Sequence, residues 1–179
     1  LVLDYFMGTG STLIASSLAK RRALWIDLNK KFIDAYKLAN KNLSLSEQNT
    51  INTDSIKELK KPNKIKEIIG DEKFSLILID PPYGDMMSRN KTGEAGRNLK
   101  SDSPTPYSKS KIDLGNFEWK KFKKTFIKSI NDSLGLLKDK GHFVFFIKDL
   151  QPTETNPNLN HADLIYELSN IIGLKYLGT

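Results

Sequence analysis

Residues 74–85 read FSLILIDPPYGD, and this stretch decides how the chain is expected to fold. Residues 74–80 form a continuous apolar run that ends in an aspartate, which is typical of a parallel strand buried on both faces. Pro81 and Pro82 then hold the backbone in a rigid turn and supply no N–H donors. The sequence therefore predicts a buried strand that carries a carboxylate, Asp80, to the edge of a sheet.

A second stretch, LVLDYFMGTGST at residues 1–12, repeats this plan with glycines in place of prolines. An expected strand over 2–5 leads into Gly8-Thr9-Gly10 and then into an expected helix over 11–21. The glycines permit a tight bend and let a ligand approach the backbone, and the helix presents its positive end there. This turn is expected to form one wall of a binding site.

The rest of the chain alternates between short apolar runs and segments with helical spacing. Strands are expected at 23–27, 50–54, 142–147 and 174–177, and helices at 30–42, 56–70 (one or two short ones), 117–137 and 163–172. This alternation predicts an α/β fold, a parallel sheet with helices on both faces. Ligands of such sheets bind beyond the carboxyl ends of the strands, so the two aspartate turns are expected to line one cleft.

Residues 84–116 form a long loop without apolar periodicity, and a loop of this length is usually functional or disordered. The 179 residues suffice for one domain, 1–179, which begins and ends inside strand-like runs and is interpreted as a piece of a longer protein. The 153–160 segment is expected to be a second loop. We treat 84–116 as a possible nucleic-acid contact region.

Composition narrows the classes of site and partner. The chain has no cysteine and two histidines, which excludes disulfides and cysteine nucleophiles and leaves no expected metal site. No apolar run approaches the length of a membrane span and no signal peptide is visible, so a cytoplasmic enzyme or binding protein is expected. The net charge of +7 favours a polyanionic partner, although a lysine-rich composition can also reflect an AT-rich genome.

The glycine turn alone leaves several ligands open. A phosphate loop would place a lysine after its last glycine, and a dinucleotide site would place glycine where Leu13 stands. S-adenosylmethionine and a purely structural turn remain. Asp27 ends the second strand and is suited to the ribose hydroxyls of a nucleoside, or else caps the next helix. Asp54 ends the third strand and would meet an adenine edge, or serve as a local cap.

The turn at residues 80–83 offers hydrogen-bond acceptors and few donors. Such a site suits a planar ring with an amino group, whose protons would go to Asp80 and the carbonyl of Pro81 while the ring stacks on Tyr83. Directing the amino protons to acceptors frees the nitrogen lone pair to attack a sulfonium methyl group, by alignment and without a strong base. The alternative is a rigid turn with a packing tyrosine.

These residues resemble the amino-methyltransferases that act on exocyclic nitrogens of nucleic-acid bases. LDYFMGTGST is similar to their D-P-F-x-G-S-G-T-T cofactor motif, DPPYGD to their D/N/S-P-P-Y/F catalytic motif, and LLKDKGHFVFFIKD to the stretch after the catalytic loop. Tyr5 departs from the usual proline, and the usual terminal hairpin is missing. The resemblance implies a Rossmann-like class I methyltransferase fold and S-adenosyl-L-methionine as cofactor. It implies cofactor binding by Asp4, Phe6, Gly8, Gly10 and Asp27, and catalysis by Asp80, Pro81, Pro82 and Tyr83. Asp54 is a further candidate for cofactor binding, from its position at the end of the third strand.

The resemblance favours a DNA methyltransferase, for adenine N6 before cytosine N4, with or without a restriction partner. An RNA methyltransferase of the tRNA guanine-N2 kind is the alternative, because Gly84 follows Tyr83 as it does in those enzymes. A catalytically silent nucleic-acid-binding fragment is the third possibility. The oligomeric state stays open. Phosphate contacts are expected from Arg89, Lys91, Arg97, Lys120, Lys121, Lys123 and Lys124.

Overall fold

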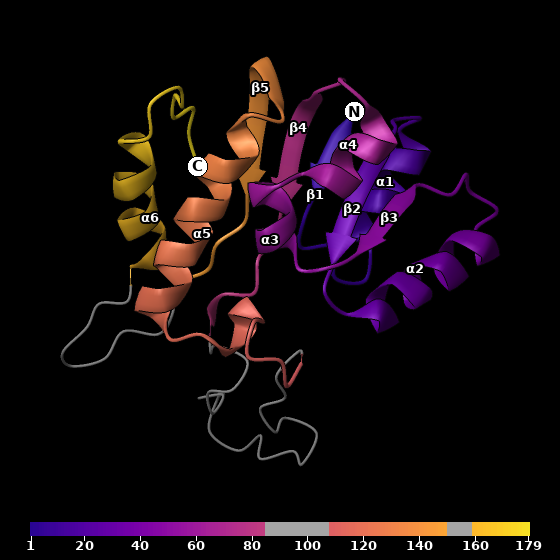
Figure 1. Ribbon diagram of the computed structural model, residues 1–179, viewed down its shortest axis with the longest axis horizontal. Helices are drawn as coiled ribbons and strands as arrows, with labels where there is room; N and C mark the ends of the chain where they lie inside the picture. Colours follow the sequence, from indigo (N-terminus) through magenta and orange to yellow (C-terminus); the bar gives the residue numbers. More distant parts are fainter. Residues whose placement is uncertain (85–107, 150–158) are drawn as a thin grey trace.

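The computed structural model describes residues 1–84, 108–149 and 159–179 (Figure 1). Strands and helices alternate along the described chain, as predicted. The elements are β1 (Val2–Asp4), α1 (Ser11–Leu18), β2 (Ala23–Asp27), α2 (Lys30–Asn42), β3 (Asn49–Asn52), α3 (Ser55–Lys60), α4 (Asn63–Ile69), β4 (Phe74–Ile79), the short 3₁₀ helix η3 (Leu114–Asn116), α5 (Trp119–Leu134), β5 (Leu137–Phe145) and α6 (Asn160–Ser169).

The five described strands form one parallel sheet in the order β3-β2-β1-β4-β5. The chain moves outward from β1 through β2 to β3 and returns to the other side of β1 as β4. The strand order therefore reverses between β1 and β4, and such a reversal is where open α/β sheets bind ligands. Figure 1 shows η3 just beyond the carboxyl ends of these strands.

Helices cover both faces of the sheet because successive side chains of a strand point to opposite faces. One face packs against α3, α4, α5 and α6, with buried Leu3, Leu24, Ile26, Ile65, Phe122, Phe126 and Leu164. The other packs against α1 and α2, with buried Val2, Trp25, Leu13, Ile33 and Tyr36. Each fully buried large apolar side chain stabilises the fold by about 1.5–3 kcal/mol. The prediction of a Rossmann-like sheet between helices is confirmed.

The structure moves several expected boundaries. β5 begins at Leu137 rather than at residue 142, and α5 ends correspondingly earlier, at Leu134. The segment 138–141 has no apolar side chain, and the pairing with β4 passes over it from Leu137 to His142 with a shift of register. β5 lies at the edge of the described sheet, where exposed side chains are tolerated. α6 begins at Asn160, three residues before the expected start.

The strand expected at 174–177 is wrong. These residues pair with no strand of the described chain, and Tyr176 and Leu177 are exposed. A strand needs a neighbouring ladder to satisfy its backbone, which an apolar pattern by itself does not supply. The loop expected at 153–160 lies almost wholly outside the described residues. In the described parts, no helix combines the length and the apolar character that crossing a membrane requires.

Candidate active site

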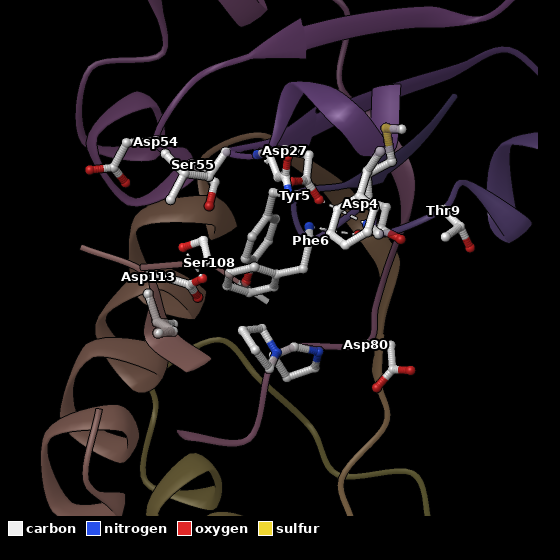
Figure 2. Close-up of a pocket in the computed structure, with 18 of the residues that line it drawn as sticks. Asp4, Tyr5, Phe6, Thr9, Asp27, Asp54, Ser55, Asp80, Ser108 and Asp113 are labelled. Atoms are coloured by element: carbon white, nitrogen blue, oxygen red, sulfur yellow. Dashed lines mark hydrogen bonds between the residues drawn. The ribbon is translucent and has the colours of Figure 1, made fainter. Parts of the chain in front are cut away.

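A pocket of about 1200 Å³ opens at the carboxyl edge of the sheet, where the strand order reverses. The segments that follow β1, β2, β3 and β4 form most of its wall, and the segment before α5 and Phe146, just after β5, also line it. Its polar lining includes Asp4, Thr9, Asp27, Asp54, Ser55, Asp80, Ser108 and Asp113 (Figure 2). The two aspartate turns therefore lie in the same pocket, as their shared sheet edge led us to expect.

The turn after β1 uses its two glycines differently. Gly8 has a φ of +53° and lines the pocket, and a Cβ built there would meet no atom within 4 Å. Gly10 has a φ of +87°, and a Cβ there would lie 3.0 Å from the Cβ of Tyr36 in α2. Gly10 is not among the residues that line the pocket. Gly8 thus leaves room for a ligand at the backbone, whereas Gly10 lets α1 begin against α2.

Asp27, at the end of β2, holds the glycine turn in place. Its Oδ2 accepts a hydrogen bond from the N–H of Gly8 at 2.9 Å, and its Oδ1 accepts one from the N–H of Asn29 at 2.7 Å. Asn29 is the residue that caps α2, by accepting from the N–H of Lys31; the alternative in which Asp27 caps this helix is wrong. Burial raises the pKa of Asp27, and the two N–H groups oppose the rise.

Asp4 ends β1 in buried surroundings. It is 3% exposed, and its Oδ1 accepts a hydrogen bond from the N–H of Phe6 at 2.8 Å. Burial, with a further contribution from nearby Asp27 and Asp80, raises the pKa of Asp4 to about 8, against the effect of the Phe6 N–H. None of these three carboxyl groups forms an ion pair within the described residues. Their arrangement favours a positively charged ligand.

The substitution Asp4→Asn is expected to remove a pH dependence of stability. Asp4 keeps its proton up to about pH 8 in the folded chain and loses it near the ordinary carboxyl pKa of 3.8 in the unfolded chain. The folded state therefore binds one more proton between these values, so the wild-type free energy of unfolding falls as the pH rises through this window. The stability of the variant relative to wild type should rise by on the order of a few kcal/mol between about pH 5 and about pH 9.

Denaturant unfolding at both pH values measures this effect. Asparagine keeps an oxygen that can accept from the N–H of Phe6, so the comparison isolates the charge. Asp34→Asn is the matched control, because Asp34 is an exposed carboxylate on α2 that pairs with Lys30. A stability difference between Asp4→Asn and wild type that is the same at both pH values would contradict the raised pKa.

The turn after β4 has hydrogen bonds of its own and packs closely against the segment before α5. The hydroxyl of Tyr83 donates to Oδ1 of Asp80, and the N–H of Gly84 donates to the carbonyl of Pro82 at 2.8 Å. Gly84 has a φ of +65°, and a Cβ there would lie 2.6 Å from the carbonyl oxygen of Phe117. Because this neighbour is backbone and cannot give way as a flexible side chain would, glycine is needed at this position.

The same turn presents acceptors to the pocket. Asp80 is exposed, and its Oδ2 makes no hydrogen bond within the described residues. Pro81 is buried and Pro82 is half-buried, and neither carries an N–H. The arrangement has the acceptor character that the sequence predicted for it.

Asp54, expected at an adenine edge, lines the pocket and also caps α3. Its Oδ1 accepts from the N–H groups of Ile56 at 3.0 Å and Lys57 at 3.4 Å. Ser55 and Ile56 line the pocket beside it. The capping bonds fix the position of this carboxylate. Figure 2 shows Asp54 at the upper left and Asp80 at the lower right, with Asp27 and then Asp4 to the right of Asp54 along the upper part of the view.

The four lysines of α5 that were expected to contact nucleic acid differ in their surroundings. The Nζ of Lys123 lies 2.9 Å from Asp163 and 3.3 Å from Glu167, both in α6, and the hydrogen bond to Asp163 contributes most to raising its pKa. Lys123 thus joins α5 to α6, a role that the sequence did not indicate. Lys120, Lys121 and Lys124 are exposed. The other expected contacts lie outside the described residues: Arg89, Lys91 and Arg97.

Sequence reasoning missed the pocket residues that come from other elements. Phe146 lines the pocket and is 57% exposed, and its N–H donates to the carbonyl of Ile79 at 3.0 Å, which places it level with Asp80. Phe146 belongs to the apolar run at 142–147, which was interpreted only as a strand. Ser108 and Asp113 reach the pocket from the long loop. No group of three metal-ligating side chains occurs in the described part of the chain.

Comparisons with known proteins agree on the fold. The sequence profile of the family described as "Conserved hypothetical protein 95" matches residues 1–100. No curated protein matches the chain at a significant level. A SAM-dependent methyltransferase from Agrobacterium tumefaciens superposes with a TM-score of 0.56 at 18% identity, over 94% of this chain and 43% of that one.

Two further structures are similar. TrmN from Thermus thermophilus has a TM-score of 0.52 at 16% identity, over 80% of this chain and 32% of that one. An rRNA methylase from Streptococcus thermophilus has a TM-score of 0.51 at 11% identity, over 95% and 69%. At these identities the likeness shows the fold, which is that of SAM-dependent methyltransferases. The chain spans less than half the length of two of these structures and about two thirds of the third.

Proposed function

The chain belongs to the family described as conserved hypothetical protein 95, and from this premise we propose that it is an S-adenosylmethionine-dependent methyltransferase that modifies an exocyclic amino nitrogen of a nucleic-acid base. One observation carries the proposal. Gly8, Asp27 and the acceptor turn at 80–83 line a single pocket at the point where the strand order reverses. The residues proposed to bind the cofactor and the residues proposed to accept the amino protons thus line the same pocket.

The pocket residues fit S-adenosylmethionine. When bound, this cofactor supplies a methyl group on a positively charged sulfonium. Asp4 and Asp27 offer it carboxyl groups without a cationic partner in the described chain, and Gly8 leaves the backbone open beside them. Asp27 would accept the ribose hydroxyls, and Asp54 would face the adenine edge from the far side. Phe6 lines the pocket, and Gly10 supports the turn by its packing on α2.

The turn at 80–83 supports chemistry on an amino group. Asp80 and the carbonyl of Pro81 would accept the two amino protons, which directs the nitrogen lone pair toward the methyl donor. Tyr83 would offer its ring to the base, and its hydroxyl bond to Asp80 holds ring and carboxylate together. Fixed acceptors of this kind need no reorganisation during the reaction.

We place RNA first as the substrate and DNA second. The similar structure from Streptococcus thermophilus is described as an rRNA methylase, and Gly84 after Tyr83 suits the guanine-N2 alternative from the sequence. The sequence of the cofactor motif, FMGTGST, is closer to that of the DNA enzymes and supports DNA as the substrate. We further propose that residues 1–179 form one catalytic domain. In this proposal the 84–116 loop contacts nucleic acid together with Lys120, Lys121 and Lys124, and Arg89, Lys91 and Arg97 belong to the same loop.

Methyl transfer from tritiated cofactor tests the proposal. Ribosomal RNA, total tRNA and genomic DNA are offered separately, and the products are digested to nucleosides. We expect label in RNA, as a base methylated on its amino nitrogen. Label in DNA, as N6-methyladenine or N4-methylcytosine, would make DNA rather than RNA the first candidate substrate. Cofactor binding without transfer to any of them would favour the catalytically silent alternative.

Phe146→Ala is expected to weaken use of the nucleic-acid substrate. The exposed ring lies level with Asp80 and lines the pocket, and stacking on an aromatic ring contributes about 1–3 kcal/mol per base. The KM for RNA should rise about tenfold or more, while cofactor affinity stays unchanged because the ring is one strand beyond Asp80. Phe146→Tyr keeps the stacking face and should retain activity. An unchanged KM in Phe146→Ala would show that the ring does not contact the base.

A further inference from the structure

A second, shallower hollow lies beside the pocket and carries the opposite charge. It measures about 480 Å³ and shares Ser108 and Ser110 with the pocket. Lys109, Lys111 and Lys121 line it, and no carboxyl group of the described residues does. The pocket, in contrast, is lined by five aspartates and two lysines, Lys30 and Lys31, and Lys30 pairs with Asp34. We call the surface formed by Lys109, Lys111 and Lys121 the lysine hollow.

The segment that carries two of these lysines is held by its own hydrogen bonds. The side-chain amide of Asn116 donates to the carbonyls of Ser108 and Ser110, both at 2.9 Å. Asp113 accepts from the hydroxyl of Ser108 at 2.6 Å and from the N–H of Gly115 at 2.8 Å. The backbone on either side of Lys109 is therefore fixed, which lowers the entropic cost when a ligand orders the lysines.

The third lysine is held by an aromatic ring. The Nζ of Lys121 lies 3.6 Å from the centroid of Phe117, a cation–π contact. Phe117 is itself packed in the core, at 9% exposed. Within the described residues none of the three lysines forms an ion pair, whereas Lys123 on the same helix has two. The hollow thus offers three positive charges that the described fold does not neutralise with carboxylates.

We propose that the lysine hollow seats a backbone phosphate of the nucleic-acid strand whose base enters the pocket. This inference rests on the proposed function. Ammonium groups bind phosphates and set the register of a strand without reading its sequence. The aspartates of the pocket outnumber its two lysines and disfavour a phosphate, so the strand would keep its backbone on the hollow. The base would cross the shared rim at Ser108 and Ser110 to reach Asp80.

Two triple variants with equal charge change test the inference. The first is Lys109→Gln, Lys111→Gln and Lys121→Gln. The matched control is Lys73→Gln, Lys138→Gln and Lys140→Gln, which removes three exposed lysines at the amino ends of β4 and β5, the opposite edge of the sheet. Fluorescence anisotropy measures binding of a short single-stranded RNA, and of DNA of the same sequence, across about 50–200 mM salt. Calorimetry measures cofactor binding in parallel.

The hollow variant should bind RNA about tenfold more weakly at the lowest salt, and its log–log salt slope should flatten by about 0.7 for each phosphate that the lysines no longer hold. The control should keep both values, and both variants should bind cofactor as wild type does. DNA should show the same pattern if the phosphate alone is recognised. A weakening confined to RNA would indicate that the hollow also touches the ribose.

Three outcomes overturn the inference. They are unchanged RNA binding by the hollow variant, an equal weakening in the control, and a weaker affinity with no change of salt slope. If the hollow variant also failed to bind cofactor, the single charge reversal Lys111→Glu would carry the same test. A wild type that transfers methyl groups, together with a hollow variant that binds RNA normally, would defeat the inference and leave the proposed function standing. A wild type that binds cofactor but neither nucleic acid would defeat both.

Discussion

Asp80→Ala is expected to lower the rate of methyl transfer at least about a hundredfold, the effect of removing one fixed polar group that acts on the reacting atoms. Asp80 is the exposed acceptor of the turn after β4, and it lies in the same pocket as Gly8 and Asp27, the proposed cofactor-binding residues. Its removal leaves an amino proton without a partner and the nitrogen lone pair undirected. Single-turnover transfer from labelled cofactor to RNA measures the rate.

Cofactor binding separates this effect from a loss of structure. Asp80 makes its described hydrogen bond to Tyr83 and holds no backbone group of the glycine turn. Cofactor affinity in Asp80→Ala should therefore remain close to that of wild type. Tyr83→Phe is the companion variant, because it removes the hydroxyl bond to Asp80 while keeping the stacking ring, and it should lose much less activity. A full transfer rate in Asp80→Ala would refute the catalytic assignment.

Asp27→Ala is expected to weaken cofactor binding by about 1.5–3 kcal/mol, roughly tenfold to a hundredfold in affinity, the range for hydrogen bonds to a charged group. The structure supplies a second reason beyond the proposed interaction with the ribose. Asp27 accepts hydrogen bonds from Gly8 and Asn29, so its removal also frees the turn that borders the cofactor. Calorimetric titration with S-adenosylmethionine measures the change in affinity.

The two contributions of Asp27 can be told apart. Asp27→Asn keeps an acceptor for one backbone N–H but removes the charge and one of the two acceptor oxygens, so its affinity should lie between those of Asp27→Ala and wild type. Asp71→Ala, at an exposed position before β4 and away from the pocket, should leave affinity unchanged. An unaltered cofactor affinity in Asp27→Ala would reduce Asp27 to a residue that merely joins β2 to the glycine turn.

Much of the fold was readable because apolar periodicity reports burial directly. The run at 74–80 and the alternation of strand and helix patterns predicted β4 and the parallel sheet. The edge strand was the exception. Residues 138–141 carry polar side chains and are inserted between the two parts of β5 that pair with β4, Leu137 and the residues from His142 on, which their own pattern does not indicate. The segment 174–177 shows the converse, a strand-like pattern that pairs with no strand of the described chain.

Some residues of the candidate site were also recognisable from the sequence, and others were not. Asp4, Asp27 and Asp80 were recognisable because each ends an apolar strand, and parallel strands bring their carboxyl ends to one edge. Lys123 carried no sign of its acidic neighbours in α6, which lie 40 and 44 residues away along the chain. Gly8 and Gly10 look alike in the sequence, yet Tyr36 packs against only one of them.

By itself the sequence determined that this chain forms a parallel α/β sheet and that two aspartate turns lie at the same edge of it, because both follow from local patterns of burial and backbone freedom. Only the tertiary structure decided which charges stand where. Within the described residues it placed carboxyl groups without ion pairs in the pocket, gave Lys123 to α6, and set Lys109, Lys111 and Lys121 around a separate hollow. Charge interactions depend on distance in space and on burial, and neither quantity is present in the order of residues along a chain.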